Sequence, residues 1–226
     1  MQISEIFKLF DDIGCVTFAT VKDGKPETRI AYLYAYDDEG LYFRTMVPKS
    51  FYKQLKEVPY VSICGLKGNS QYQKNDKGIP VFEPGYTVRL SGLVEEVPLK
   101  TIKEKAETND MFQLGVLFSE QHATSRTFVI KSGTGELYDF DFEMKKRGHK
   151  LLRKRFSLNG QSDSHYEVVI TNDCVACLEC MGHCTYNAIY LKNEEPQIDP
   201  EKCDLCGDCI PACEAHAIKV RLIEKK

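Results

Sequence analysis

The last quarter of the chain reads Cys174-Val-Ala-Cys177-Leu-Glu-Cys180-Met-Gly-His-Cys184, and later Cys203-Asp-Leu-Cys206-Gly-Asp-Cys209-Ile-Pro-Ala-Cys213. Each run has the spacing C-x2-C-x2-C-x3-C, and the second follows the first by 29 residues. The same offset relates Ala188 and Ile189 to Ala217 and Ile218. A fixed internal period indicates a duplicated structural unit. This part of the chain is therefore predicted to fold as two related halves around eight cysteines.

The spacing suits a cubane iron–sulfur cluster, which needs four thiolates directed at one compact cage. Three cysteines set three residues apart can wrap a tight loop around one face of the cage. The fourth follows a longer step, points away and serves the other cluster. The expected ligand sets are Cys174, Cys177, Cys180 with Cys213, and Cys203, Cys206, Cys209 with Cys184. Two [4Fe–4S] clusters are therefore the predicted cofactors of this region.

Two other chemistries could use eight cysteines. Structural zinc is one, although zinc sites usually pair two C-x2-C units across a longer loop. Disulfides are the other, and they need an oxidising compartment. The N-terminus carries an early acidic residue and has no long apolar run, so it does not resemble a secretion signal. Zinc remains the main alternative to iron–sulfur clusters.

Over residues 166–222 the repeats resemble the bacterial two-cluster ferredoxins. That family usually carries Pro after the fourth cysteine, where this chain has Thr185 and Glu214. Because this Pro shapes the exit of the chain and is not a ligand, the difference concerns the local loop more than the clusters. The resemblance implies a small ferredoxin-like α+β domain holding two clusters over residues 166–226. Residues 159–165 read as a polar linker before it.

Composition and charge narrow the class of protein. The net charge of −3 argues against a general nucleic-acid binder. No stretch approaches the roughly 20 apolar residues of a membrane span. The protein is therefore expected to be soluble and cytoplasmic, in a reducing and anaerobic cell. Cys15 and Cys64 stand in apolar strand-like runs and are expected to be small core residues.

Acidic residues are concentrated near the cysteines. Residues 171–226 hold 6 Lys+Arg against 10 Asp+Glu, a net of −4, whereas residues 1–170 hold 24 against 23. An acidic face on a small electron carrier would steer it towards a basic redox partner. The alternative is that Glu194, Glu195, Glu201 and Asp204 are simply solvated loop residues. Both interpretations stay open.

Upstream, the sequence alternates strand patterns with short helices. Strands are expected at 15–21, 27–36, 41–46, 60–65, 86–95 and 128–131, helices at 3–12, 49–57 and mainly over 98–120, and a hairpin over 137–158 turning at Gly148. Residues 67–84 read as a polar loop. The basic run 145–150, with Arg153-Lys-Arg155, is interpreted as a solvated hairpin tip, and a docking patch is the alternative.

Three stretches of this region carry a second resemblance: Gly24-Lys-Pro-Glu-Thr-Arg29-Ile-Ala-Tyr32, Gly40-Leu-Tyr-Phe-Arg-Thr45 and Pro48-Lys49-Ser50-Phe-Tyr-Lys-Gln-Leu55. Together they resemble the split-barrel flavoproteins related to pyridoxamine 5′-phosphate oxidase, over residues 1–145. The resemblance implies an α+β domain over residues 1–158, with an antiparallel six-stranded split β-barrel and flanking helices. It also implies a homodimer with FMN in a cleft at the subunit interface.

The same resemblance suggests which residues contact FMN. Arg29, Lys49 and Ser50 would contact the phosphate, and Thr45 would face the flavin ring. The N-terminus of a helix offers free N–H groups and a positive dipole end to an anion, which suits Lys49 and Ser50. The alternative is that Arg29 and Lys49 are ordinary exposed charges. No catalytic residue is indicated, and Gly133-Thr-Gly135 lacks the third glycine of a dinucleotide fingerprint.

A flavin takes two electrons and can release them singly, whereas an iron–sulfur cluster moves one at a time. The combination predicts an FMN- and iron–sulfur-dependent oxidoreductase with an external ferredoxin-like partner and a small-molecule acceptor. The alternative is an electron-transfer module that relays electrons between protein partners without a small substrate of its own. A zinc-bearing interaction module on a flavin-free barrel is the third possibility.

Overall fold

The computed structural model describes residues 1–68, 73–74, 76–78, 80–81, 85–140, 152–160 and 164–224. The chain divides into two units. The first comprises residues 1–67, 88–136 and 156–161, and the second comprises residues 68–87, 137–155 and 162–226. The basic run 145–150, with its turn at Gly148, and much of the polar loop 67–84 lie outside the described residues.

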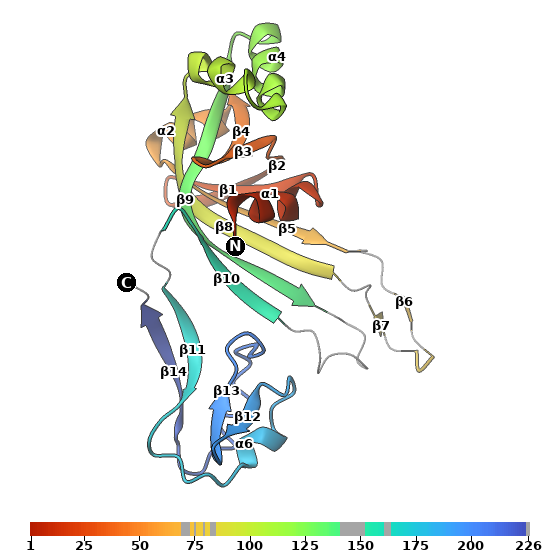
Figure 1. Ribbon diagram of the computed structural model, residues 1–226, viewed down its shortest axis with the longest axis vertical. Coiled ribbons are helices and arrows are strands. Elements are labelled where there is room, and N and C mark those ends of the chain that lie inside the picture. The colour runs from red at the N-terminus through yellow and green to blue at the C-terminus, as the bar shows by residue number, and fades with distance from the viewer. Residues whose placement is uncertain are drawn as a thin grey trace. The chain divides into compact units, whose positions relative to one another are not determined.

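One antiparallel sheet dominates the N-terminal part of the chain (Figure 1). Its strands are β1 (Val16–Lys22), β2 (Lys25–Ala31), β3 (Ala35–Asp37), β4 (Gly40–Met46), β5 (Tyr60–Lys67), β8 (Gly85–Val97), β9 (Ser125–Phe140) and β10 (Leu152–Leu158). They run in the order β2-β1-β5-β8-β9-β4-β3, and β10 pairs with β9. With the helices beside it, this sheet confirms the α+β class.

The expected count of six strands is wrong, because the described residues form an eight-stranded sheet. The sequence predicts one strand over 27–36, but the β1–β2 ladder stops at Ala31 and β3 begins at Ala35. Between them Leu33 and Tyr34 turn into the core, with 5% and 6% of their surface exposed. The predicted strand 128–131 and residues 137–140 of the hairpin's first limb belong to one strand of 16 residues, β9. The return limb, β10, therefore extends the same sheet.

Alternation along the strands separates a core face from an outer face. Phe18 and Ile63, paired across β1 and β5, are fully buried. The Phe18 and Phe43 ring centroids lie 5.0 Å apart. The next pair in the register, Thr17 with Cys64, faces the other way. Cys64 is therefore exposed, and so is Cys15, which corrects the expectation that both are core residues.

The helices cover the sheet and its ends. They are α1 (Ile3–Asp11), α2 (Ser50–Glu57), α3 (Leu99–Ala106), the 3₁₀ turn η1 (Asp110–Phe112) and α4 (Gln113–Gln121). The predicted helical region 98–120 is thus broken, because the Asn109 side chain accepts a hydrogen bond from the Met111 N–H and starts a new turn. Figure 1 shows α3 and α4 side by side. The buried Phe112 lies between these helices and Tyr42 of β4, with ring centroids 4.8 Å apart.

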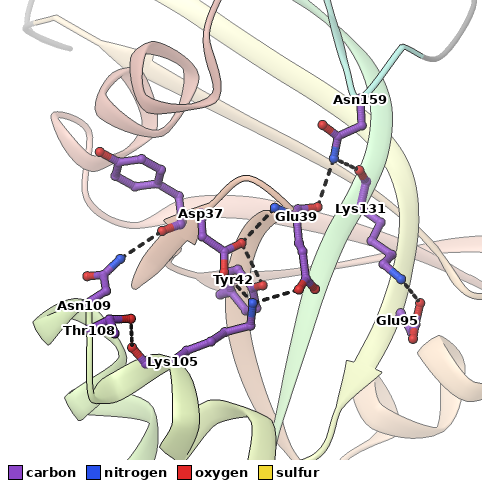
Figure 2. A network of polar contacts seen from close by, with 10 residues as sticks. Asp37, Glu39, Tyr42, Glu95, Lys105, Thr108, Asn109, Lys131 and Asn159 are labelled. Atoms are coloured by element: carbon purple, nitrogen blue, oxygen red, sulfur yellow. Dashed lines mark hydrogen bonds and ion pairs between the residues drawn. The ribbon is translucent and has the colours of Figure 1, made fainter.

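A polar network fixes α3 to the turn between β3 and β4 (Figure 2). Lys105 Nζ donates to Asp37 at 2.6 Å and to Glu39 at 2.9 Å. The Tyr42 hydroxyl donates to the other Asp37 oxygen at 2.9 Å. Burial lowers the pKa of Lys105, but its bonds to the two carboxylates outweigh this effect and raise the pKa above its usual value. The side chain therefore stays charged in a largely buried position.

The strands β8 and β9 approach closely at two glycines. A Cβ on Gly92 would lie 2.1 Å from the Ser132 carbonyl oxygen, and one on Gly133 would lie 2.4 Å from the Ser91 carbonyl oxygen. Any larger residue would push the two backbones apart. The close packing of β8 and β9 therefore explains why position 133 is a glycine, and no dinucleotide-binding site is needed to explain it.

The described residues of the second unit contain three small antiparallel ladders (Figure 1). β11 (Ser164–Ile170) pairs with β14 (Ile218–Glu224), and β12 (Ile189–Lys192) pairs with β13 (Glu195–Ile198). The third ladder pairs β6 (Gln73–Lys74) with β7 (Pro80–Val81), and α6 (Glu179–Gly182) is a single helical turn. Ile189 and Ile218, related by the offset, open β12 and β14, so the repeat is also structural. Among the described residues, none of the helices could cross a bilayer.

Candidate functional site

Two cavities in the second unit are lined by cysteines. The first cavity is lined by Cys174, Cys177, Cys180 and Cys213. The second cavity is lined by Cys184, Cys203, Cys206 and Cys209. The fold thus brings three cysteines of each repeat together with the last cysteine of the other.

The two cysteine loops share an unusual backbone. Ala176 and Leu178 have φ angles of 54° and 68°, and the equivalent residues Leu205 and Gly207 have φ angles of 61° and 83°. Three of these four residues are not glycine, and residues other than glycine rarely adopt this left-handed backbone conformation. Such strain persists where surrounding structure or a bound group requires it, and it gathers at functional sites.

Backbone N–H groups point at the sulfurs in a repeated pattern. Ala188 N–H donates to Cys184 Sγ at 3.2 Å, and the equivalent Ala217 N–H donates to Cys213 Sγ at 3.3 Å. Ala176 N–H donates to Cys174 Sγ at 3.4 Å. Hydrogen bonds of this kind favour the thiolate, which is the form that binds iron. The donor set therefore fits an iron–sulfur cluster in each cavity.

The thiols are crowded and partly buried. The pKa of Cys209 is raised to about 11, chiefly by burial and also by the neighbouring Cys203, Cys184 and Cys206. Burial also raises the pKa of Cys180, together with Cys213, Cys174 and Cys177. Within the part of the chain that the structure describes, no three His, Cys, Asp or Glu side chains are arranged to hold a single metal ion. Four thiols gathered this closely would carry charge only beside a bound cation.

The walls of the two cavities differ. Apart from its cysteines, the first cavity is lined by Ile170, Val175, Leu178, Pro196, Ala215 and Ile218. The second cavity has polar wall residues, including His183, Tyr186 and Asp204. Asp204 accepts a hydrogen bond from the Tyr138 hydroxyl at 2.9 Å and pairs with Arg153 at 3.3 Å. The duplicated halves are therefore chemically unequal.

The contacts correct the interpretation of Arg153 and Arg155 as solvated, whereas Lys154 is exposed as expected. The side chains of Arg153 and Arg155 are only 13% and 15% exposed. Arg155 pairs with Glu167 at 3.7 Å. The solvated-loop interpretation is wrong for Asp204 too, since its side chain is 24% exposed and bonded to two others. The sequence gives no sign of this pairing, because its members are 51 and 66 residues apart.

In the first unit, Arg29 lies on β2 beneath α2. Its guanidinium donates to Thr20 Oγ1 at 2.5 Å and to Gln54 Oε1 at 2.7 Å. It also lies over the Phe51 ring, 4.4 Å from the centroid. Burial lowers the pKa of Arg29, although the nearby Glu27 opposes this shift. Arg29 is thus fixed at the edge of the core, and it is not a freely exposed charge.

The other three predicted FMN contacts lie at or near α2. Lys49 and Ser50 begin the helix, and Thr45 lies on the neighbouring strand β4. Lys49 and Ser50 are exposed, and Lys49 makes no side-chain cap. The Thr45 hydroxyl is buried and has no hydrogen-bond partner among the described residues. An uncapped helix start and an unpaired buried hydroxyl fit a ligand with an anionic group.

Gln54 is a residue of this region that sequence reasoning missed. It is 2% exposed and connects Thr20, Arg29 and Glu27 through its amide. Its position three residues after Phe51 and one before Leu55 places it on the buried face of α2. A polar residue on the apolar face of a predicted helix was the signal available in the sequence.

The comparisons with known proteins identify the first part of the chain. Residues 3–135, more than half of the chain, match the family described as pyridoxamine 5′-phosphate oxidase. Residues 195–218 match a 4Fe-4S binding domain and contain Cys203, Cys206, Cys209 and Cys213. The chain therefore belongs to the pyridoxamine 5′-phosphate oxidase family, an FMN-binding split-barrel family, with an iron–sulfur domain at its C-terminal end.

One curated relative and several solved structures are similar to parts of the chain. A component of an ion-translocating oxidoreductase complex from Methanosarcina acetivorans is 38% identical over 48 residues, which is 21% of this chain and 18% of that protein. A NimC/NimA family protein from Clostridium acetobutylicum is 20% identical with a TM-score of 0.49, over 69% of this chain and 92% of that one. An FMN-binding protein from Nostoc punctiforme, related to pyridoxamine 5′-phosphate oxidase, is 13% identical with a TM-score of 0.44, over the same shares. The family matches and the curated relative support a redox or electron-transfer role.

Proposed function

We propose that this chain is an oxidoreductase that uses two [4Fe–4S] clusters and FMN. Electrons pass between an external ferredoxin-like protein, the clusters and the flavin, and a small molecule is reduced. The clusters supply single-electron transfer, and the flavin connects this to two-electron chemistry. The observation that carries the proposal is the gathering of eight cysteines into two cavities of four.

The cluster part of the proposal assigns all eight thiols as ligands. The first cavity would hold one cluster through Cys174, Cys177, Cys180 and Cys213, and the second cavity would hold the other through Cys184, Cys203, Cys206 and Cys209. The repeated N–H···S bonds and the repeated left-handed residues support an equivalent role for both cavities. Equivalent construction favours two clusters over one.

The flavin part of the proposal assigns Arg29, Lys49 and Ser50 to the phosphate and Thr45 to the ring. Two of the guanidinium N–H groups of Arg29 are taken by Thr20 and Gln54, which leaves donors that could face a phosphate. The bonds to Thr20 and Gln54 would hold Arg29 in place before the ligand arrives, so less entropy would be lost on binding.

A homodimer would place FMN between two copies of the first unit. The outer face of the sheet carries exposed apolar side chains: Ile30 is 66% exposed, Leu93 50% and Leu66 49%. The strand registers put the three side chains on one face. Ile30 and Cys64 both pair with Thr17, and Leu66 follows Cys64 by two residues. The Ser62 and Ser91 hydroxyls are 2.7 Å apart, and Leu93 follows Ser91 by two residues. An exposed apolar face of this kind supports self-association. Light scattering should give twice the mass of the chain.

The function is tested by electron transfer under anaerobic conditions. A photochemically reduced bacterial ferredoxin is mixed with the purified protein, and the flavin and cluster absorption are followed together. The proposal expects both chromophores to bleach, and ferredoxin reoxidation to continue when a suitable small oxidised molecule is added. Ferredoxin that is reoxidised no faster with the protein than without it would contradict the proposal.

The relay between protein partners is the second candidate function. The apolar wall of the first cavity, with Val175 71% exposed, favours it, because an exposed apolar side chain beside a redox centre suits contact with another protein. The same experiment separates the two. Sustained turnover with a small molecule alone as acceptor indicates an enzyme, whereas turnover only with a second redox protein indicates a relay.

A further inference from the structure

The second cysteine loop is bonded to two side chains from β9 and β10. Arg153 Nη2 lies 3.3 Å from Asp204 Oδ1, and the Tyr138 hydroxyl donates to the same oxygen at 2.9 Å. The Arg153 backbone N–H donates to the Glu201 carbonyl oxygen at 2.7 Å. The Arg153 guanidinium lies 5.4 Å from the centroid of the Tyr138 ring. All of these residues belong to the second unit.

This arrangement places fixed charges beside the second cavity. Asp204 follows Cys203 directly and lines that cavity. Arg153 is near enough to interact electrostatically with the Cys203 sulfur. Both side chains are mostly shielded from water, with 13% of Arg153 and 24% of Asp204 exposed. Charges in such surroundings act more strongly than they do in bulk water.

The first repeat has no equivalent pair. The residue 29 positions before Asp204 is Val175, which is uncharged and 71% exposed. Cys180 and its equivalent Cys209 both interact electrostatically with the other thiols of their own cavities, so the difference between the repeats lies at Cys203 and Asp204. The two halves of the duplication therefore share their cysteine arrangement and differ in the charges around it.

We propose that Arg153 and Asp204 set the reduction potential of the cluster in the second cavity, Arg153 raising it and Asp204 lowering it. This inference rests on the proposed function, since it requires both clusters. Reduction adds one negative charge to a cluster, so a nearby cation favours the reduced form and a nearby carboxylate disfavours it. Net charge and hydrogen bonding are established determinants of cluster potential. Arg153 and Asp204 are thus tuning residues, and neither is a ligand.

Removing the charge of Arg153 and removing the charge of Asp204 should shift the reduction potential of the second cluster in opposite directions. A purely structural role of the two residues would not produce shifts of opposite sign. Arg153→Gln removes the cation and leaves Asp204 without its counter-charge, so the second cluster becomes harder to reduce. Asp204→Asn removes the carboxylate and leaves Arg153, so the same cluster becomes easier to reduce. Arg153→Lys keeps the charge and should restore the wild-type value. We expect a change of about tenfold in the one-electron reduction constant in each direction, which is about 59 mV.

The test is a redox titration of the full chain with both cofactors bound, under anaerobic conditions and followed by electron paramagnetic resonance. Wild type should show two one-electron waves, and the two variants should move the same wave in opposite directions while the other stays. Arg221→Gln, which removes an exposed arginine from β14, is the matched control and should move neither wave.

Three results would overturn the inference. They are shifts of the same sign in the two variants, equal movement of both waves, and no movement beyond that of Arg221→Gln. Each of these requires two waves in wild type, so each leaves the proposed function standing. A wild-type protein without two cluster waves would instead contradict the proposed function, and this inference with it.

Discussion

Replacing Gln54 with Leu tests whether the polar network under α2 is an integrated part of the fold. Leu is similar in size and keeps the apolar contacts of the helix face, but it cannot make hydrogen bonds. Gln54 Oε1 accepts from Thr20 Oγ1 at 2.6 Å and from Arg29 Nη2 at 2.7 Å. Its amide nitrogen donates to Glu27. The substitution therefore removes three hydrogen bonds at once.

The cost follows from how well each former partner can reach water. Thr20 is 3% exposed, so its hydroxyl loses its acceptor with no replacement, at about 1–3 kcal/mol. The Arg29 side chain is 19% exposed and keeps its bond to Thr20, which limits its share to about 1 kcal/mol. The Glu27 side chain is 41% exposed and is rehydrated at little cost. Burying Leu recovers about 1 kcal/mol, so the net loss should be about 2 kcal/mol.

Urea unfolding followed by far-ultraviolet circular dichroism measures this loss. The matched control is Gln121→Leu at the exposed end of α4, which should change the free energy of unfolding by no more than about 0.5 kcal/mol. A Gln54→Leu variant as stable as wild type would refute the reasoning. It would mean that Thr20 and Arg29 find other partners and that the network does not hold Arg29 in place.

Three further predictions concern the cofactors and the core. Cys213→Ser should abolish the cluster of the first cavity, and Cys184→Ser should abolish that of the second. Each substitution should lower the iron content from about eight to about four per chain. Loss of the cluster that is bound by the other three cysteines of the substituted residue's own repeat would contradict the crossed ligand sets. Thr45→Val should leave the FMN-free protein as stable or about 1 kcal/mol more stable while weakening FMN binding about tenfold, and a fluorescence titration that shows unchanged affinity would exclude Thr45 from the site. Lys105→Met should cost about 1–3 kcal/mol by urea unfolding. Because the folded-state pKa of Lys105 is raised, its contribution is complete below the unfolded pKa of about 10.4 and is lost only as pH rises through the folded value. The loss should therefore be the same at pH 7 and pH 9, and a difference that disappears by pH 9 would contradict the assigned charge.

Local patterns predicted the elements well. The apolar spacing of Ile6, Phe7 and Phe10 gives α1, and the alternation in β1 gives its buried face. The three-residue spacing predicted that the first three cysteines of each repeat share a loop, and each such trio lines one cavity. These signals lie within one element or one loop. They are therefore readable before any tertiary structure is known.

Contacts between distant segments could not be read in this way. Cys64 and Ile63 are adjacent in an apolar run, and only the register with β1 decides which of them faces the core. Local patterns predicted strands over 128–131 and from 137, but their joining across Gly133 into the single strand β9 depends on the pairing with β8. Arg153 reads as a surface charge until the fold brings it to Asp204. In each case the deciding partner is remote in the sequence.

The amounts of iron, sulfide, zinc and flavin in anaerobically purified protein test the central claim most directly. The proposed function predicts about eight iron and eight sulfide per chain, from two four-iron clusters, together with one FMN and no stoichiometric zinc. A colourless protein that holds zinc in place of iron, or one that holds iron and sulfide but no flavin after reconstitution with FMN, would contradict it.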